Sequence, residues 1–268
     1  MPHCRAMLKA MDLTGRTALV CGASQGIGQA AAVALSELGA RVILVARSAE
    51  NLEKTRSLLT PSRGGRHEVW PCDLSVEAEL DGLLQKAKAA GIEIVVNNTG
   101  GPKGGPITQA AASEFETAFR QHIVSAQKIL QAVLPHMKEQ KFGRFVNVIS
   151  TSVKAPIAGL GVSNTIRAAM ANWAKTVAGE VAPFGITMNN VLPGYTQTAR
   201  LEQLRKNGAT ARQVSESDVE KQWLSTIPAG RFGEAWELGA AIAFLASPAA
   251  GYINGINLPV DGGRTPSL

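Results

Sequence analysis

The chain has 268 residues, of which 45% are hydrophobic and 18% are charged, and its formal net charge is +6. This length and composition suit a single domain with a well-filled core. The Lys and Arg residues are scattered without a basic run, which argues against a nucleic-acid-binding protein. No apolar run approaches the ~18 residues of a membrane-spanning helix. The three cysteines stand far apart, so we expect a cytoplasmic protein without disulfides or a metal site.

Residues 1–12 lack the apolar segment of a secretory signal, and we expect them to be a flexible extension before a single domain over 13–268. Short apolar runs then alternate with amphipathic, helical stretches. Strands are predicted at 17–20, 41–46, 67–70, 92–96, 144–149, 186–191 and 256–260. Because parallel strands need crossover connections, this alternation predicts an α/β fold. We expect one Rossmann-type doubly wound domain, with a seven-stranded parallel sheet and helices on both faces.

The helices expected between these strands include one long helix over 115–137 and another over 166–177. The segment at about 195–230 is rich in charge and shows no strand pattern. A long irregular segment in a compact domain is usually a lid or a binding loop. We therefore predict that this segment covers a binding site.

A glycine-rich turn follows the first predicted strand in the sequence C-G-A-S-Q-G-I-G. Gly22, Gly26 and Gly28, with Ser24, Gln25 and Ile27 between them, lead into a predicted helix. Glycines let the backbone turn sharply and approach a pyrophosphate, and the start of the helix offers unpaired N–H groups. The pattern is typical of a dinucleotide site, although glycine is common in any strand-to-helix turn.

The end of the second strand predicts which dinucleotide binds. An enzyme that uses NAD usually has an acidic residue there for the ribose hydroxyl. This sequence has Ala46 and Arg47, and the first acid is Glu50. A guanidinium pairs well with a phosphate, so the pattern favours NADP(H) over NAD(H). The alternative is that Arg47 only interacts with solvent.

The ordered motifs from Leu13 to Gly263 resemble the short-chain dehydrogenase/reductase family, close to its 3-oxoacyl-acyl-carrier-protein reductases and glucose dehydrogenases. They are C-G-A-S-Q-G-I-G, C-D-L (72–74), N-N-T-G (97–100), N-V-I-S (147–150), P-G-Y-T-Q-T (193–198) and V-D-G-G (260–263). The resemblance covers nearly the whole chain. It implies that the protein acts on a small carbonyl or alcohol substrate and forms a homotetramer.

The resemblance also assigns residues to the parts of the dinucleotide. Asp73 and Leu74 would hold the adenine, and Asn98, Thr99 and Gly100 would line the ribose. Pro193, Gly194 and Thr196 would face the nicotinamide, with Thr198 near the diphosphate or the amide.

The catalytic positions depart from the family pattern, which has Ser, Tyr, Lys and Asn. Ser150 matches the serine, but Ser163 stands at the tyrosine position and Arg167 at the lysine position, while His122 aligns with the asparagine. Arg167 has donors for the ribose contacts but does not exchange its proton. An alkyl hydroxyl at Ser163 is a far poorer acid than a phenol and is shorter by a ring, so the usual tyrosine chemistry is excluded.

Three side chains are candidates to replace the missing proton donor. His122 has an ordinary pKa suited to proton transfer at neutral pH, but it is equally consistent with a buried core histidine. Tyr195 offers a phenol that more commonly only lines a pocket, and Lys154 belongs to a loop that runs outward in the family. Ser163 is also consistent with a helix N-cap or with a hydrogen-bond partner of the substrate. Arg167 with Arg200, Arg205 and Arg212 is consistent either with attraction of an anionic substrate or with a solvated lid.

Three functional hypotheses follow. The first is an NADP-dependent oxidoreductase with an altered proton donor, and the second is an inactive NADP-binding pseudoenzyme that serves as a sensor or scaffold. The third is a hydrolase, because G-A-S-Q-G (22–26) fits a nucleophile elbow and Asp73 and His136 follow in a suitable order. The hydrolase hypothesis leaves N-N-T-G and V-D-G-G unexplained.

Overall fold

The computed structural model describes residues 10–267, and its seven strands form one parallel sheet in the order β3-β2-β1-β4-β5-β6-β7. The predicted fold class is confirmed. The chain order reverses between β1 and β4, and this is the point where a doubly wound sheet opens a crevice for a ligand. The strands are β1 (Thr17–Cys21), β2 (Arg41–Ala46), β3 (Glu68–Pro71), β4 (Ile94–Asn97), β5 (Gly143–Val148), β6 (Ile186–Pro193) and β7 (Asn257–Val260).

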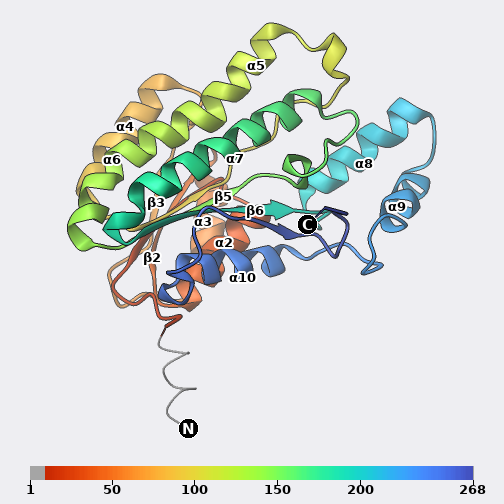
Figure 1. The fold of residues 1–268 in the computed structure, drawn as a ribbon. Coiled ribbons are helices and arrows are strands. Elements are labelled where there is room, and N and C mark those ends of the chain that lie inside the picture. The colour runs from red at the N-terminus through yellow and green to blue at the C-terminus, as the bar shows by residue number, and fades with distance from the viewer. Residues whose placement is uncertain (1–9, 268) are drawn as a thin grey trace.

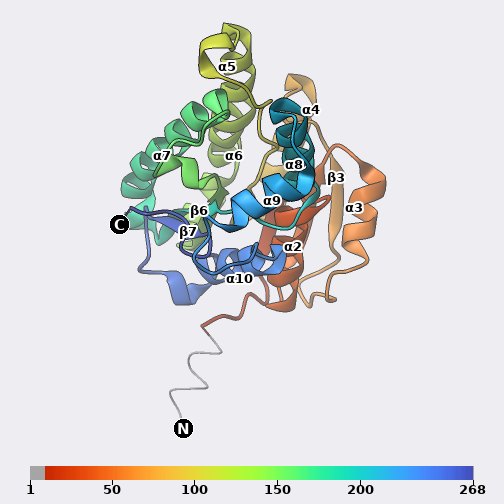
Figure 2. The same cartoon turned by 90° about the vertical axis from the view of Figure 1, so that its right-hand side faces the viewer.

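Helices cover both faces of the sheet (Figure 1). The helices α8 (Ala199–Arg212) and α9 (Glu216–Leu224) lie beyond the carboxyl ends of the central strands (Figure 2). The α-helices are α2 (Gly26–Glu37), α3 (Ala49–Arg56), α4 (Glu77–Ala89), α5 (Ala112–Phe119), α6 (Ser125–Gln140), α7 (Gly161–Val181), α8 (Ala199–Arg212), α9 (Glu216–Leu224) and α10 (Ala235–Ala246). Short 3₁₀ turns are η1 (Ile107–Gln109), η3 (Thr151–Val153), η4 (Ala182–Phe184) and η5 (Pro248–Ala250), and η2 (Arg120–Val124) is a π-helical turn.

The sheet lies between two apolar cores. One core joins the strands to α2, α3 and α10, and the other joins them to α4, α6 and α7. The central strands are apolar on both sides because both faces are covered, as expected for a parallel sheet. All five residues of β1 are buried, as are the four middle residues of β2. This rigid sheet fixes the strand ends from which the site is built.

Four asparagines form a ladder of side-chain amide hydrogen bonds across β4, β5, β6 and β7. The Nδ2 of Asn97 donates to the Oδ1 of Asn147 at 2.8 Å, and Asn147 donates in the same way to Asn190 at 2.8 Å. Asn190 continues the ladder to Asn257 at 2.8 Å. Each pair is also opposed in the strand register. The ladder therefore satisfies polar groups that the core would otherwise leave without partners.

Two expectations about the elements need correction. The predicted long helix over 115–137 is interrupted by η2, where the backbone bonds shift to a π pattern around His122. The segment at 195–230 is not irregular but folds into α8 and α9, each with a serine or threonine N-cap. Residues 1–9 of the predicted extension lie outside the described residues, and Ala10 already accepts a backbone hydrogen bond from Ala249 at 2.8 Å.

Candidate active site

A cleft of about 910 Å³ lies along the carboxyl edge of the sheet, and its lining includes residues at or after the end of every strand from β3 to β7. A volume of this size suits a cofactor and a small substrate together. Most of the predicted site residues line it, although they come from every part of the chain. They are Gly22, Ser24, Gln25, Ile27, Arg47, Asp73, Leu74, Asn98, Thr99, Gly100, Ser150, Ser163, Arg167, Pro193, Gly194, Thr196 and Thr198.

The glycine turn needs glycine for two different reasons. Gly22 and Gly26 have φ angles of +63° and +57°, which strain any residue with a Cβ. Gly28 is buried beneath the turn, and a Cβ there would lie 2.2 Å from the carbonyl oxygen of Gly22. The turn therefore packs tightly against the start of α2 and against Asn98, whose Nδ2 donates to the Gly22 carbonyl at 3.3 Å. This leaves the backbone N–H groups at the start of α2 beside the cleft.

The residues at the ends of β2 and β3 make this end of the cleft polar and charged. Arg47 is exposed and has no ion pair with a carboxylate among residues 10–267. Asp73 accepts hydrogen bonds from the side chain and backbone of Ser75, and these bonds are the main cause of its lowered pKa. The Oγ of Ser48 caps α3 by accepting from Asn51 N at 3.2 Å, so the N-terminus of α3 directly follows Arg47 in the chain. Arg47 and this helix start, and not the Asp73 carboxylate, would attract a phosphate.

At the other end, the turn after β6 is held by backbone contacts. Gly194 N donates to Val260 O at 3.0 Å, and a Cβ on Gly194 would lie 2.6 Å from Asp261. The hydroxyl of Thr196 donates to Gly194 O at 3.2 Å, and Thr198 caps α8 by accepting from Leu201 N at 3.3 Å. The 193–198 segment therefore has a fixed path along the wall of the cleft.

Ser150 stands at the end of β5 with its hydroxyl in the cleft. Its Oγ accepts a hydrogen bond from Ser152 N at 3.0 Å and caps η3. Because the oxygen is the acceptor in this bond, the hydroxyl hydrogen stays available for a ligand. The Ser150 hydroxyl can therefore donate a hydrogen bond to an oxygen atom of a ligand in the cleft.

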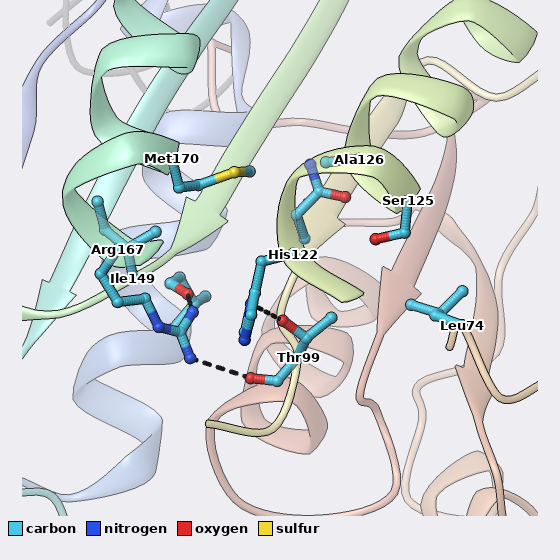
Figure 3. A pocket seen from close by; sticks show the side chains of 10 residues that line it. Leu74, Thr99, His122, Ser125, Ala126, Ile149, Arg167 and Met170 are labelled. Atoms are coloured by element: carbon cyan, nitrogen blue, oxygen red, sulfur yellow. Dashed lines mark hydrogen bonds between the residues drawn. The ribbon is translucent and has the colours of Figure 1, made fainter. Parts of the chain in front are cut away.

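Arg167 projects from α7 into the interior and lines both the cleft and a small cavity beside it (Figure 3). Its Nη1 donates to Val148 O at 3.0 Å and its Nη2 to Thr99 O at 3.2 Å. Burial lowers the pKa of Arg167 to about 10, with a further contribution from the charge of Arg200. The guanidinium therefore stays charged at neutral pH, and two carbonyl dipoles offset its burial.

His122 lies in η2 against the same small cavity, whose volume of about 10 Å³ is close to that of one water probe. Its Nδ1 shares a hydrogen bond with Thr99 Oγ1 (Figure 3), while its Nε2 is buried without a protein partner among the described residues. Burial, and then the charge of Arg167, lowers the pKa of His122 to about 3. The ring is therefore neutral at physiological pH, and it does not line the main cleft. The expectation that His122 is a general acid is not supported by this geometry.

Ser163 and Lys154 are also placed by the structure. The helix α7 begins at Gly161 after Leu160, so Ser163 lies inside the first turn and is not its N-cap. Its half-buried side chain faces the cleft. The neighbouring Asn164 instead ties the preceding loop, with its Nδ2 donating to Ile157 O at 2.9 Å. Lys154 does not line the cleft, so a catalytic role for it is not supported.

The structure rules out the hydrolase arrangement. Ser24 follows the carboxyl end of β1, whereas His136 lies beside Gly91, which precedes the amino end of β4. Because β1 and β4 are parallel neighbours, these residues lie at opposite ends of the sheet. A catalytic triad cannot form across that separation.

Sequence reasoning missed one charged residue of the cleft, Arg264, whereas Tyr195 lines the cleft, which is the more common role that the sequence analysis gave it. Tyr195 stacks on Trp223 with ring centroids 4.7 Å apart, and the Arg264 guanidinium lies 4.5 Å from the centroid of the Tyr195 ring. Both residues line the cleft. The position of Arg264 directly after V-D-G-G could have predicted its place in the cleft. Residues that follow a strand of a parallel sheet lie at its carboxyl edge, where ligands bind.

Comparisons with known proteins agree with this architecture. Residues 22–265 match the family described as enoyl-(acyl carrier protein) reductase. The chain is 31% identical to the NADPH-dependent reductase BacG of Bacillus subtilis (strain 168) over 261 residues, which cover 96% of this chain and 100% of that protein. It is 34% identical to the 3-oxoacyl-[acyl-carrier-protein] reductase FabG of Vibrio cholerae, over 94% of this chain and 98% of that protein.

Solved structures give the same result. The crystal structure of YwfH, an NADPH-dependent reductase involved in bacilysin biosynthesis, superposes with a TM-score of 0.88 at 30% identity and covers 94% of this chain and 99% of that one. The L-sorbose reductase of Gluconobacter frateurii in complex with NADPH and L-sorbose has a TM-score of 0.89 at 26% identity, over 97% of this chain and 100% of that one. From the fold, the glycine turn and these relatives together, the chain belongs to the short-chain dehydrogenase/reductase family of oxidoreductases.

Proposed function

We propose that this protein is an NADP(H)-dependent oxidoreductase that interconverts a carbonyl and an alcohol with an altered proton donor. One observation carries the proposal: a continuous cleft joins the glycine turn and Arg47 at one end to Ser150 at the other. A binding site for phosphate groups and a hydroxyl that polarises a carbonyl therefore share one solvent-accessible space.

The residues present fit the phosphorylated dinucleotide. The turn from Gly22 to Gly28 can fold this tightly only with glycine, because a Cβ on Gly22 or Gly28 would collide with Asn98 or with Gly22, and the turn presents its backbone to the cleft where a diphosphate would bind. Arg47, without a carboxylate partner among the described residues, would bind the additional phosphate. Asp73, Leu74 and the segment 98–100 would hold adenosine and ribose, and the segment 193–198 would face the nicotinamide. Bound NADP(H) would supply or accept the hydride.

The side chains beside the reacting oxygen would manage its charge. Ser150 donates its free hydroxyl hydrogen to the substrate oxygen, and the buried charge of Arg167 stabilises the negative charge that develops there. Ser163, which is short and faces the cleft, lets water approach the place that a tyrosine ring would fill. We propose that this water, held by the Ser163 hydroxyl and in exchange with the solvent in the cleft, relays a proton to the substrate oxygen as the hydride arrives, and that solvent returns the proton that the water gives up.

A second candidate function is binding of NADP(H) without turnover. The observation that favours it is the chemistry of the changed positions. His122 is kept neutral by burial, and the guanidinium of Arg167 keeps its proton. Ser163 is a weak acid, so the cofactor contacts are better preserved than the proton transfer. Such a protein would act as a sensor of the reduced nucleotide or as a scaffold.

The experiment that separates these functions begins with titration calorimetry of NADPH and NADH. Oxidation of NADPH is then followed by absorbance against a panel of ketones, quinones and acyl thioesters. Turnover by the wild-type protein supports the oxidoreductase. Tight binding without turnover, combined with gain of turnover in the Ser163→Tyr/Arg167→Lys double variant, supports the binding protein. Absence of a saturable site for either nucleotide contradicts both.

We also propose that the protein is a cytoplasmic homotetramer. Within the described residues no helix has the length and apolarity needed to cross a membrane, and Cys21 and Cys72 are free thiols. Trp236 is 67% exposed on α10, and Tyr252 is fully exposed before β7. Exposed aromatic residues of this kind are common at interfaces between subunits, and they support an oligomer. Light scattering coupled to gel filtration measures the mass directly.

A further inference from the structure

The charges that line the cleft are divided unequally between its two ends. Asp73 is the only carboxylate among the described residues that line it, and it lies at the dinucleotide end near Arg47. The rest of the cleft is lined by Arg167 and Arg200, which donate to backbone carbonyls of the segment after β4, and by Arg264, which follows β7. A ligand in this part of the cleft therefore meets positive charges without a negative one.

Arg264 is held in a defined orientation. Its Nη2 donates to the Tyr195 hydroxyl at 3.4 Å, and its Nε donates to Thr226 Oγ1 at 3.3 Å. Its guanidinium also lies over the Tyr195 ring, whose other contacts are a stack with Trp223 and an edge contact with Phe232. This aromatic tier fixes the guanidinium at the wall of the cleft without neutralising its charge.

Arg264 also has no ion pair with a carboxylate within residues 10–267. The acid that lies nearest to it in the sequence, Asp261, uses one carboxylate oxygen to accept from Gly263 N at 3.0 Å and the other to accept from Thr265 N at 2.8 Å. Two arginines elsewhere in the C-terminal part differ in this respect. Arg205 pairs with Glu216 and Glu220, and Arg231 pairs with Glu237.

We propose that Arg264 is a specificity-determining residue that binds an anionic group of the substrate, a carboxylate or a phosphate. The inference rests on the proposed oxidoreductase function and names its substrate class. The Tyr195 hydroxyl accepts a hydrogen bond from the Arg264 guanidinium and helps to hold it at the wall of the cleft. The apolar residues Ile157, Leu160 and Leu204 also line the cleft. The substrate is therefore a keto or hydroxy compound with an apolar body and a negative charge distant from the reacting carbon.

Binding of matched probes tests this assignment without requiring turnover. 4-Acetylbenzoate and its neutral methyl ester are each titrated by calorimetry into the protein, with and without saturating NADPH. Because a hydrogen bond to a charged group is removed in the ester, we expect the carboxylate to bind roughly tenfold to a hundredfold more tightly. In Arg264→Gln the carboxylate should bind as weakly as the ester, while the affinity of the ester should not change. 4-Acetylphenyl phosphate shows whether the site prefers a phosphate or a carboxylate.

Arg56→Gln is the matched control, because it removes the same charge from the exposed face of α3, where Arg56 pairs with Glu53. It should leave the preference for the anion intact. Arg264→Lys should keep part of the preference and shows that charge, rather than folding, is lost in the glutamine variant. Equal binding of acid and ester by the wild type, undetectable binding of both anionic probes, or an unchanged preference in Arg264→Gln would each overturn the inference.

The outcome for NADPH is separate. If the nucleotide does not bind but the Arg264-dependent preference for the anion persists, the proposed function fails and the anion site stands. If NADPH binds and the anion preference is absent, the proposed function stands and the assignment of Arg264 fails.

Discussion

The two ends of the cleft are built from different materials. The dinucleotide end depends mainly on backbone: the glycine turn and the start of α2 determine its shape, and the side-chain amide of Asn98 donates to the Gly22 carbonyl. The other end depends on individual side chains, and at three of the four positions predicted to be catalytic the sequence differs from the pattern of the family. A backbone cradle tolerates almost no substitution, whereas single side chains exchange while the fold is kept. Substitutions can therefore change the chemistry at one end of the cleft while the cofactor-binding end is kept.

The largest effect is expected when a side chain is added inside the glycine turn. Gly28→Ala places a Cβ 2.2 Å from the Gly22 carbonyl oxygen, so the turn must move. We expect about 3 kcal/mol less free energy of unfolding, as for overpacked sites, and loss of NADPH binding. Gly82→Ala on α4 is the control, because a Cβ there meets nothing within 4 Å. That variant should be slightly stabilised in urea unfolding. Equal stability of the two variants would contradict the role of the cradle.

The next effect concerns Arg47, a side chain at the dinucleotide end of the cleft. Arg47→Ala should weaken NADPH binding by roughly tenfold to a hundredfold, because a charge-assisted contact with the phosphate is lost. NADH binding should stay the same. Calorimetry with both nucleotides measures the two affinities, and Arg56→Ala, on the neighbouring exposed surface, serves as the control. A similar loss of affinity for both nucleotides would show that Arg47 does not contact the additional phosphate of NADPH.

The burial of His122 should make the stability of the protein depend on pH. The pKa of His122 falls from 6.5 to about 3 on folding. Between these values the unfolded chain binds the proton and the native protein does not, so the ring makes stability fall as the pH is lowered. The His122→Asn variant lacks this titration, and its stability should fall less steeply, by about 1.4 kcal/mol per pH unit below pH ~6. Urea unfolding at several pH values gives both slopes. Parallel slopes would mean that His122 titrates normally in the native protein.

The smallest effect concerns the loop that precedes α7. Asn164 holds this loop through bonds to both the N–H and the carbonyl of Ile157, at 3.3 and 2.9 Å. Asn164→Ala should lower stability by about 1 kcal/mol and speed hydrogen exchange of the Ile157 amide. Asn172→Ala, at an exposed position of the same helix, is the control. Unchanged exchange at Ile157 would show that the loop is held by other contacts.

The sequence predicted the backbone end of the cleft better than the side-chain end. Alternating apolar runs and a glycine turn have local physical causes, so the sheet and the path of residues 22–28 could be predicted. The state of His122 could not, because its burial depends on η2 and on Arg167, which lies 45 positions further along the chain. The helices α8 and α9 were missed because their apolar faces are narrow. Arg264 was missed because its contacts, Tyr195 and Thr226, come from distant segments.

The asparagine ladder has a consequence for how the chain finds its native pairing. Each rung joins residues that face each other only in the native alignment of β4, β5, β6 and β7. If one strand slid by a single residue, its asparagine would turn to the opposite face and leave buried amides without partners on both neighbours. Apolar strands alone would tolerate such misalignment more readily. The ladder therefore favours the native register over shifted pairings of these strands. It also holds the carboxyl ends of β5 and β6 in a defined alignment beside the cleft.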